Sequence, residues 1–156
     1  MRFTPTGPDK TIEDTRARLA NYRKHQDAHG FSKWIILDAI SGDPIGDSGL
    51  LVLEEYGWID LGFRLAKQHW GKGLATEAAA AWVQAAFQEL NFARLGAFAH
   101  PENMASSRVL KKVGFHPAKL DQVMGMDAIV YFLEASDHPV NPLASSEIRF
   151  QGDNLR

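Results

Sequence analysis

The stretch QHWGKGLATEAAAAW, which begins at Gln68, places two glycines directly before an alanine-rich helix. Gly71 and Gly73 carry no side chains and readily adopt positive φ, so consecutive N–H groups there can converge on an anion. A helix N-terminus adds free donors and the positive end of a dipole, and Lys72 adds a cation. The junction therefore predicts a phosphate-binding turn. The alternative reading is a glycine turn that simply starts a tightly packed helix.

Three short apolar segments precede this junction, at residues 33–40, 45–54 and 58–65, and the turn sequences between them predict an antiparallel meander. A P-loop needs Gly-Lys-Ser/Thr after a longer glycine-spaced loop, and a dinucleotide-binding loop needs three spaced glycines in a parallel βαβ unit. Neither pattern is present. The glycine turn is thus predicted to bind a phosphate group outside these two nucleotide-binding motifs.

The remaining elements follow from caps and apolar patterns. Thr11 is a predicted helix N-cap, with Glu13 or Asp14 available to complete a capping box. Asn103 and Gly114 bracket a second predicted helix as its N-cap and its stop. The predicted helices are residues 11–26, 73–90 and 103–113, and further strands are predicted at 93–100 and 126–136.

Composition narrows the class of protein. The 156 residues, 45% hydrophobic and 23% charged, fit one domain with its own core. The formal net charge of −2, with scattered Lys and Arg, argues against a nucleic-acid partner. There is no cysteine and no long apolar run, and the N-terminus lacks the apolar core of a secretion signal, so we expect no disulfide, no membrane partner and a cytoplasmic location.

Two blocks of sequence resemble the GNAT family of N-acetyltransferases. QHWGKG matches the family signature Q/R-x-x-G-x-G/A, and HPENMASSRVLKKVGF is similar to a second block of the ribosomal-protein-alanine (RimJ/RimL-like) branch. The resemblance extends from about residue 31 to residue 132. It implies an α+β GNAT fold, with a mixed, mostly antiparallel central sheet flanked by helices. We expect an acetyltransferase domain at residues 1–135 and a C-terminal extension at 136–156.

The resemblance implies acetyl-CoA as the co-substrate. Its pyrophosphate would rest on the amides of the glycine turn and first helical turn, and its pantetheine arm would pair with an exposed strand edge, as in β-augmentation. The side chain of Asn103 would contact the same arm, although a helix N-cap explains that residue about as well. The residues implied to bind the cofactor are Phe63, Arg64, Leu65, Gln68, Gly71, Lys72, Gly73, Leu74, Ala75 and Asn103.

The predicted general base is Asp60. Acetyl transfer requires a neutral amine, and about a tenth of an α-amine is neutral at pH 7, against well under a hundredth of a lysine amine. Strand alternation places Asp60 on the face opposite Ile59 and Leu61, which we predict to be polar, and related sequences often have Glu at this position. Being one methylene shorter, Asp60 is expected to act through a water. The alternative is a solvated strand carboxylate; Glu54 and Glu55 rank next as bases.

The proposed acid is Ser106. Many relatives outside the branch place a tyrosine seven residues after the asparagine, but here that residue is Leu110. Ser106, three residues after Asn103, is the hydroxyl that the branch resemblance assigns to protonate the CoA sulfur. An ordinary first-turn serine explains it equally well.

The N-terminal portion departs from the family. Relatives normally have a strand and a helix before the segment that resembles MRFTPTGP, so either the sequence starts late or this fold lacks both elements. The sheet edge that this strand covers would then pair with another chain. We expect a second copy, giving a homodimer, or the C-terminal segment around Ile148 to Phe150 to cover it.

Three function classes remain open at this point. The favoured one is direct acetyl transfer from acetyl-CoA to a primary amine, such as a protein N-terminus, in a ternary complex. The others are a non-catalytic acyl-CoA-binding module, and a glycine turn for another phosphate ligand. No histidine spacing suggests zinc, so no metal is expected. Trp34 and Trp58 are candidates for an acceptor pocket, with core packing as the plainer reading.

Overall fold

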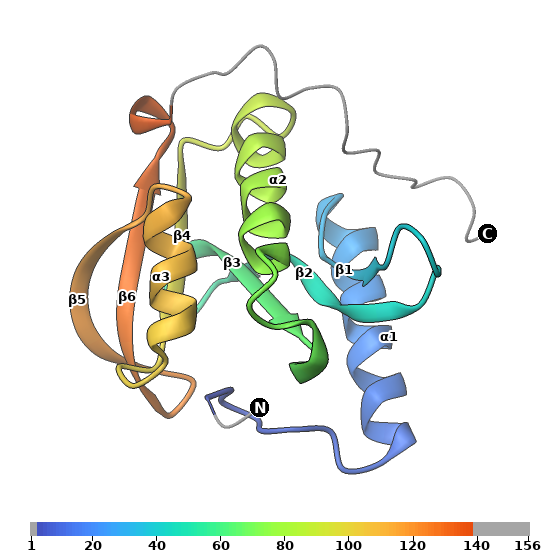
Figure 1. The fold of residues 1–156 in the computed structure, drawn as a ribbon. Coiled ribbons are helices and arrows are strands. Elements are labelled where there is room, and N and C mark those ends of the chain that lie inside the picture. Colours follow the sequence, from blue (N-terminus) through green and yellow to red (C-terminus); the bar gives the residue numbers. More distant parts are fainter. Residues whose placement is uncertain (1–2, 139–156) are drawn as a thin grey trace.

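The protein is built around one six-stranded sheet with helices on both faces (Figure 1). The computed structural model describes residues 3–138. The strands lie in the order β1-β2-β3-β4-β6-β5. Helices α2 (Leu74–Gln88) and α3 (Met104–Lys112) pack on one face, and α1 (Ile12–His29) contacts the other face through Arg18 and Tyr22. This arrangement confirms the predicted α+β fold.

The predicted meander is present. β1 (Lys33–Leu37), β2 (Pro44–Leu53) and β3 (Trp58–Leu65) pair antiparallel in sequence order. Asp38 closes the first turn by accepting from the amides of Ile40 and Ser41. β4 (Arg94–Ala99) then joins β3 in parallel and pairs antiparallel with β6 (Met126–Glu134).

The caps read from the sequence are also confirmed. The Thr11 hydroxyl accepts from the Asp14 amide, and the Asp14 carboxylate accepts from the Thr11 amide, which completes a capping box. Helix α1 runs three residues beyond its predicted end and stops at Gly30, which is in the left-handed conformation (φ 80°). Asn103 caps α3 as predicted.

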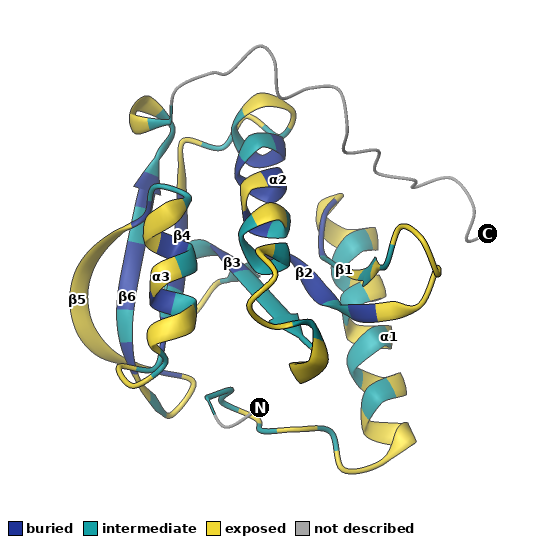
Figure 2. Ribbon diagram, viewed as in Figure 1, coloured by how far each residue is buried: buried dark blue, intermediate teal, exposed yellow. Residues whose placement is uncertain are grey.

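One strand escaped prediction. β5 (His116–Val123) pairs with β6 at the sheet edge, and seven of its eight residues are exposed (Figure 2). The segment HPAKLDQV has no apolar alternation, because neither face of its first seven residues is buried. Pro117 sits where the pairing with β6 shifts register, as expected for a proline at an edge strand.

The main core fills the space between the sheet and helices α2 and α3. It contains Leu50 and Leu61 from the meander, Trp82 and Val83 from α2, and Leu110 from α3. Trp34 contacts this core edge-on to Trp82, so its plainer packing interpretation holds. A smaller cluster on the opposite face contains Val123, Ala128 and Val130, with Trp58, Phe98 and Phe132 packed against it.

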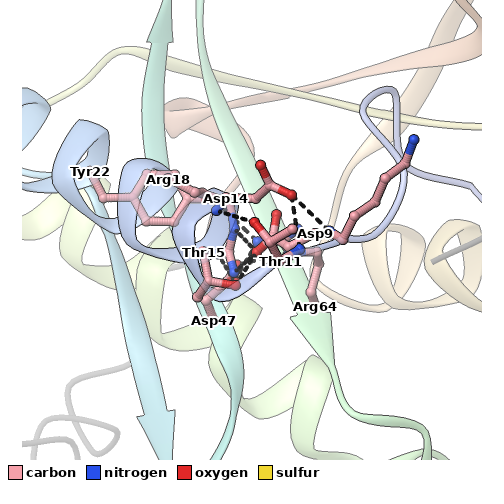
Figure 3. Close-up of polar contacts among 9 residues, drawn as sticks. Asp9, Thr11, Asp14, Thr15, Arg18, Tyr22, Asp47 and Arg64 are labelled. Carbon is pink, nitrogen blue, oxygen red and sulfur yellow. Dashed lines mark hydrogen bonds and ion pairs between the residues drawn. The ribbon is translucent and has the colours of Figure 1, made fainter.

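Charged side chains fasten α1 and the preceding segment to the sheet (Figure 3). Asp47 of β2 is only 7% exposed and pairs with Arg18 at 3.0 Å and Arg64 at 2.6 Å. Arg18 also pairs with Asp9 at 2.8 Å, and Arg64 donates to the Tyr22 hydroxyl. Each buried charge therefore has partners, as a low-dielectric site requires.

The outer edge of β1 has no strand partner among residues 3–138, and no strand precedes α1 in that range. Ile35 and Leu37 lie on this edge strand and are 50% and 57% exposed. The segment around Ile148 to Phe150, which we expected as one cover for this edge, lies outside the described residues.

Candidate active site

The candidate site begins where β3 and β4 separate. Asp60 pairs with Gly96, and this is the only residue pair joining the two strands in the described chain. Ala66 donates to Ile45 of β2, so alternation turns the N–H and C=O groups of Phe63 and Leu65 away from β2, toward the side of β4. The Leu65 carbonyl accepts from the Trp70 indole at 2.9 Å. The backbone of Phe63 and the Leu65 amide thus form an exposed strand edge.

The predicted backbone site at Phe63 to Leu65 therefore lies at this separation, whereas the side chains point elsewhere. Phe63 packs against the main core. The Arg64 guanidinium is held by Asp47 and Tyr22 on the other face. A ligand at this edge would meet main-chain groups, which suits an amide-bearing arm added beside a strand.

The glycine turn follows β3 directly. A short 3₁₀ helix, η1 (Lys67–His69), leads into Gly71 (φ 72°) and Gly73 (φ 77°). Both glycines have open space where a Cβ would point, so backbone conformation rather than packing requires glycine there. Gln68 and Lys72 are exposed beside them.

Helix α2 starts at this turn without a capping side chain. Gly73 is the N-cap, and the first helical bond is the one that the Glu77 amide donates to the Gly73 carbonyl. The amides of Leu74, Ala75 and Thr76 precede that bond and have no acceptor within the helix. Their N–H groups and the helix dipole create a place for an anion.

These parts lie together at one end of the sheet. Because β3 and β4 are parallel and each leads into a helix, their carboxyl ends share that end with the starts of α2 and α3 (Figure 1). The fold therefore brings the strand edge, the glycine turn and Asn103 to one region. Glu54 and Glu55 lie in the turn before β3, at the opposite end of that strand, and do not join it.

Asp60 lies on the predicted polar face but is buried there, which contradicts the alternative of a solvated strand carboxylate. Its side chain does lie on the face opposite Leu61, but the residue is only 5% exposed. Trp58 covers it and donates its indole N–H to Asp60 Oδ1 at 3.1 Å. Trp58 in turn packs edge-on against Phe132 and fills the space above Gly96. Alternation gave the correct face, but it did not show that aromatic residues cover that face.

Burial changes the chemistry of this carboxyl. Desolvation raises the pKa of Asp60 from its ordinary value of 3.8 to about 7, although the Lys33 charge and the Trp58 hydrogen bond both favour the ionised form. A carboxyl with a pKa near neutrality can both accept and release a proton at physiological pH. Asp60 thus has the properties of an acid–base group.

Asn103 and Ser106 are joined at the start of α3. The Asn103 carboxamide oxygen accepts from the Ser106 amide at 3.2 Å, so the capping interpretation of Asn103 is correct. The Ser106 side chain is half-buried. The neighbouring Ser107, which the sequence analysis did not single out, is buried and accepts a 2.9 Å hydrogen bond from the Tyr131 hydroxyl. The sequence could not show this contact, because it depends on how α3 packs against β6.

The cap of α3 offers a test of the two interpretations of Asn103. Asn103→Ala is expected to lower the free energy of unfolding by about 1 kcal/mol, because the Ser106 amide loses its acceptor. Asn103→Ser retains a capping oxygen and is expected to keep most of that stability in urea denaturation. If Asn103 also contacts the pantetheine arm, both variants weaken acetyl-CoA binding. Full affinity in Asn103→Ser would restrict the residue to its capping role.

Within residues 3–138, no group of three or more His, Asp or Glu side chains is placed to hold a metal ion. No helix in the same range is long and apolar enough to cross a membrane.

The sequence matches the family model described as "Acetyltransferase (GNAT) domain" over residues 1–116. The chain belongs to the GNAT acetyltransferase family. It is therefore an acetyltransferase domain of the acetyl-CoA-dependent class.

The Bacillus subtilis protein YkkB is 32% identical over 124 residues, covering 78% of this chain and 72% of that protein. The probable N-acetyltransferase YjcK of B. subtilis is 34% identical over 108 residues, covering 68% of this chain and 60% of YjcK. The chain thus spans less than two thirds of YjcK.

Solved structures share the GNAT fold. A GNAT-family acetyltransferase from Bacillus anthracis superimposes with a TM-score of 0.74 at 22% identity, over 87% of this chain and 81% of that one. The ribosomal-protein-S5-alanine acetyltransferase of Vibrio fischeri gives 0.68 at 20% identity, over 85% and 79%. The spermidine N-acetyltransferase of Vibrio cholerae, solved with CoA and spermine, gives 0.66 at 18% identity, over 83% and 79%.

Proposed function

We propose that this GNAT domain transfers acetyl from acetyl-CoA directly to a primary amine in a ternary complex. The observation that carries the proposal is the separation of β3 from β4 at Asp60. It exposes the Phe63 backbone and leads straight into the glycine turn. The pantetheine arm lies along that edge, and the pyrophosphate rests on the amides of Gly71 to Ala75 with Gln68 and Lys72 beside it.

Asp60 acts as the base. Its carboxylate takes one proton from the substrate ammonium, directly or through a water, and the neutral amine attacks the thioester carbonyl carbon. The Phe63 or Leu65 amide donates to the carbonyl oxygen as negative charge develops there. The C–N bond forms and the C–S bond breaks. Ser106 passes a proton to the departing sulfur and recovers one from the attacking nitrogen, and Asp60 returns its proton to solvent.

A protein N-terminal amine is the acceptor that we favour, as in the RimJ/RimL-like branch. The two sequence blocks of that branch and the fold shared with the V. fischeri enzyme support this choice. An α-amine needs less help from a base than a lysine or polyamine nitrogen does, because its pKa is about two units lower. A carboxyl with a pKa of about 7 is a base of suitable strength for it.

Release of CoA thiol tests the proposal. The full chain would be incubated with acetyl-CoA and, in turn, a peptide with a free N-terminus, the same peptide with a blocked N-terminus, and spermidine. We expect thiol release that depends on the free α-amine. Release with spermidine alone would mean that the acceptor is a polyamine and not an N-terminal amine. The V. cholerae spermidine N-acetyltransferase, solved with CoA and spermine, has a substrate of that class. Acetyl-CoA binding without thiol release from any amine would favour the non-catalytic acyl-CoA-binding alternative.

The limits of the domain and its assembly are also proposals. We propose that residues 1–135 form the acetyltransferase domain and that 136–156 are an extension. The unpaired edge of β1 is covered by a second copy or by that extension. Sedimentation of the full chain and of a chain ending at residue 138 distinguishes a second copy from the extension as the cover of β1. We expect a dimer of the full chain if a second copy covers the edge. A full chain that stays monomeric and protects the β1 amides from hydrogen exchange no better than the shortened chain would refute both.

A further inference from the structure

The side chain of Lys33 on β1 extends over two paired glycines, Gly49 and Gly62, toward Asp60 on β3. Lys33 pairs with Gly49 of β2, and Gly49 pairs with Gly62 of β3. A Cβ on Gly62 would lie 2.5 Å from Lys33 Nζ and 2.7 Å from its Cε. The lysine side chain therefore occupies the space that a larger residue at position 62 would fill. Residue 62 has to be glycine for the lysine to lie there.

This path brings the ammonium close to the Asp60 carboxylate. The position of that Gly62 Cβ is also 3.9 Å from Asp60 Oδ2, on the same face of β3. Lys33 Nζ also lies 6.0 Å from the centre of the Tyr22 ring of α1. The Trp58 indole closes the far side of the carboxyl.

The other charges on this face are already paired with one another. From α1, Arg18 faces Asp9 and Asp47, and from β3, Arg64 faces Asp47. From β4 and β6, Gly96 pairs with Asp60 and Phe132 packs against Trp58, while Arg94 of β4 lies over the Phe132 ring and pairs with Glu134 of β6 at 2.7 Å. Among the described residues, Lys33 is the charged group that favours the ionised form of Asp60.

We propose that Lys33 is a positioning residue for Asp60, holding a positive charge over Gly62 so that the buried carboxyl ionises near neutral pH and can take the amine's proton. The importance of this role rests on the proposed function, in which Asp60 is the base. The physical basis is independent of it, since a nearby opposite charge offsets the desolvation of a buried carboxylate.

The test compares Lys33→Met, which keeps length and removes charge, with Lys33→Arg, which keeps charge. Lys119→Met is the matched control, because Lys119 is an exposed lysine beside Asp121 on β5. The Asp60 carboxyl carbon would be titrated by NMR in full-length protein, its signal assigned by its absence in Asp60→Asn. The pH profile of kcat/KM would be measured with one amine throughout, so that the ionisation of the amine is the same for every variant.

In Lys33→Met we expect the titration midpoint of Asp60, and the acidic limb of the profile, to move up by about one pH unit. At pH 6 this lowers kcat/KM by about tenfold, whereas at pH 9 the rate approaches that of the wild type. Lys33→Arg and Lys119→Met should keep the wild-type midpoint.

An unchanged Asp60 midpoint in folded Lys33→Met would overturn the proposal. If that variant also lost rate equally at all pH values, Lys33 would have only a structural role. A shifted midpoint with an unshifted acidic limb would uphold the effect of Lys33 on the carboxyl and instead refute Asp60 as the base. The inference and the proposed function can therefore fail separately.

Discussion

Asp60→Asn is expected to lower kcat/KM by about a hundredfold or more and, in the same molecule, to raise stability above pH 7. Asparagine keeps the size of the side chain and can still accept from the Trp58 indole, but it cannot take a proton from the substrate amine. Loss of a general base typically reduces the rate by about 10²- to 10⁴-fold. Thiol release under saturating acetyl-CoA measures this effect.

The stability change has a defined pH window. The pKa of Asp60 is raised from 3.8 to about 7 on folding, so below about pH 4 the carboxyl is protonated in both states. Between about pH 4 and pH 7 the folded protein holds a proton that the unfolded chain has released, and stability falls as the pH rises. Above pH 7 the buried charge is present in full.

Asparagine resembles the protonated form and escapes this penalty. The gain in the variant should therefore be small at pH 4 and reach on the order of 2–4 kcal/mol at pH 8 in urea denaturation. Asp121→Asn is the matched control, because that carboxylate is exposed and its pKa is lowered by Lys119. A gain that does not grow with pH would mean that Asp60 is not a buried carboxyl of raised pKa in solution.

Gly71→Glu combined with Gly73→Glu is expected to raise the Kd for acetyl-CoA at least about a hundredfold, or about 2.7 kcal/mol. The two carboxylates would lie at the free amides that start α2, where the pyrophosphate is proposed to rest, and would repel it. Titration calorimetry with acetyl-CoA measures the change.

Backbone strain needs its own control, because glutamate is unfavourable at positive φ wherever it is placed. Gly42→Glu with Gly125→Glu puts the same side chains at two turns of matching conformation, φ 76° in each case, that also have open space around the Cβ. This control should keep wild-type affinity. Equal acetyl-CoA affinity of the two double variants would mean that the glycine turn only starts α2 and does not bind the pyrophosphate. No binding by the folded wild type would contradict the cofactor assignment.

Features that depend on neighbouring residues in the chain could be predicted from the sequence. The capping box of Thr11 and Asp14, the Asn103 cap and the meander ending at Leu65 all satisfy their hydrogen bonds within a few residues or between adjacent strands. The glycine turn is of the same kind, because positive φ at Gly71 and Gly73 is a local requirement. These local rules, together with the two family blocks, were sufficient to identify the GNAT fold.

Features that depend on distant segments could not be predicted. Alternation put Asp60 on the correct face, but its burial depends on Trp58 packing against Phe132 of β6, seventy-odd residues away. Strand β5 has no apolar pattern, since its first seven residues are exposed and only Val123 joins a hydrophobic cluster.

The sequence by itself determined the elements other than β5 and the turn that starts α2, because short-range hydrogen bonding and glycine conformation specify them, and its two blocks indicated the family by resemblance. Only the tertiary structure decided the chemistry of the candidate base. The strand register aligns Lys33, Gly49 and Gly62 across β1, β2 and β3. This alignment brings the Lys33 ammonium close to the Asp60 carboxyl, which aromatic packing shields from water. The ionisation of a buried group is set by what surrounds it in space, and that arrangement exists only once the sheet has formed.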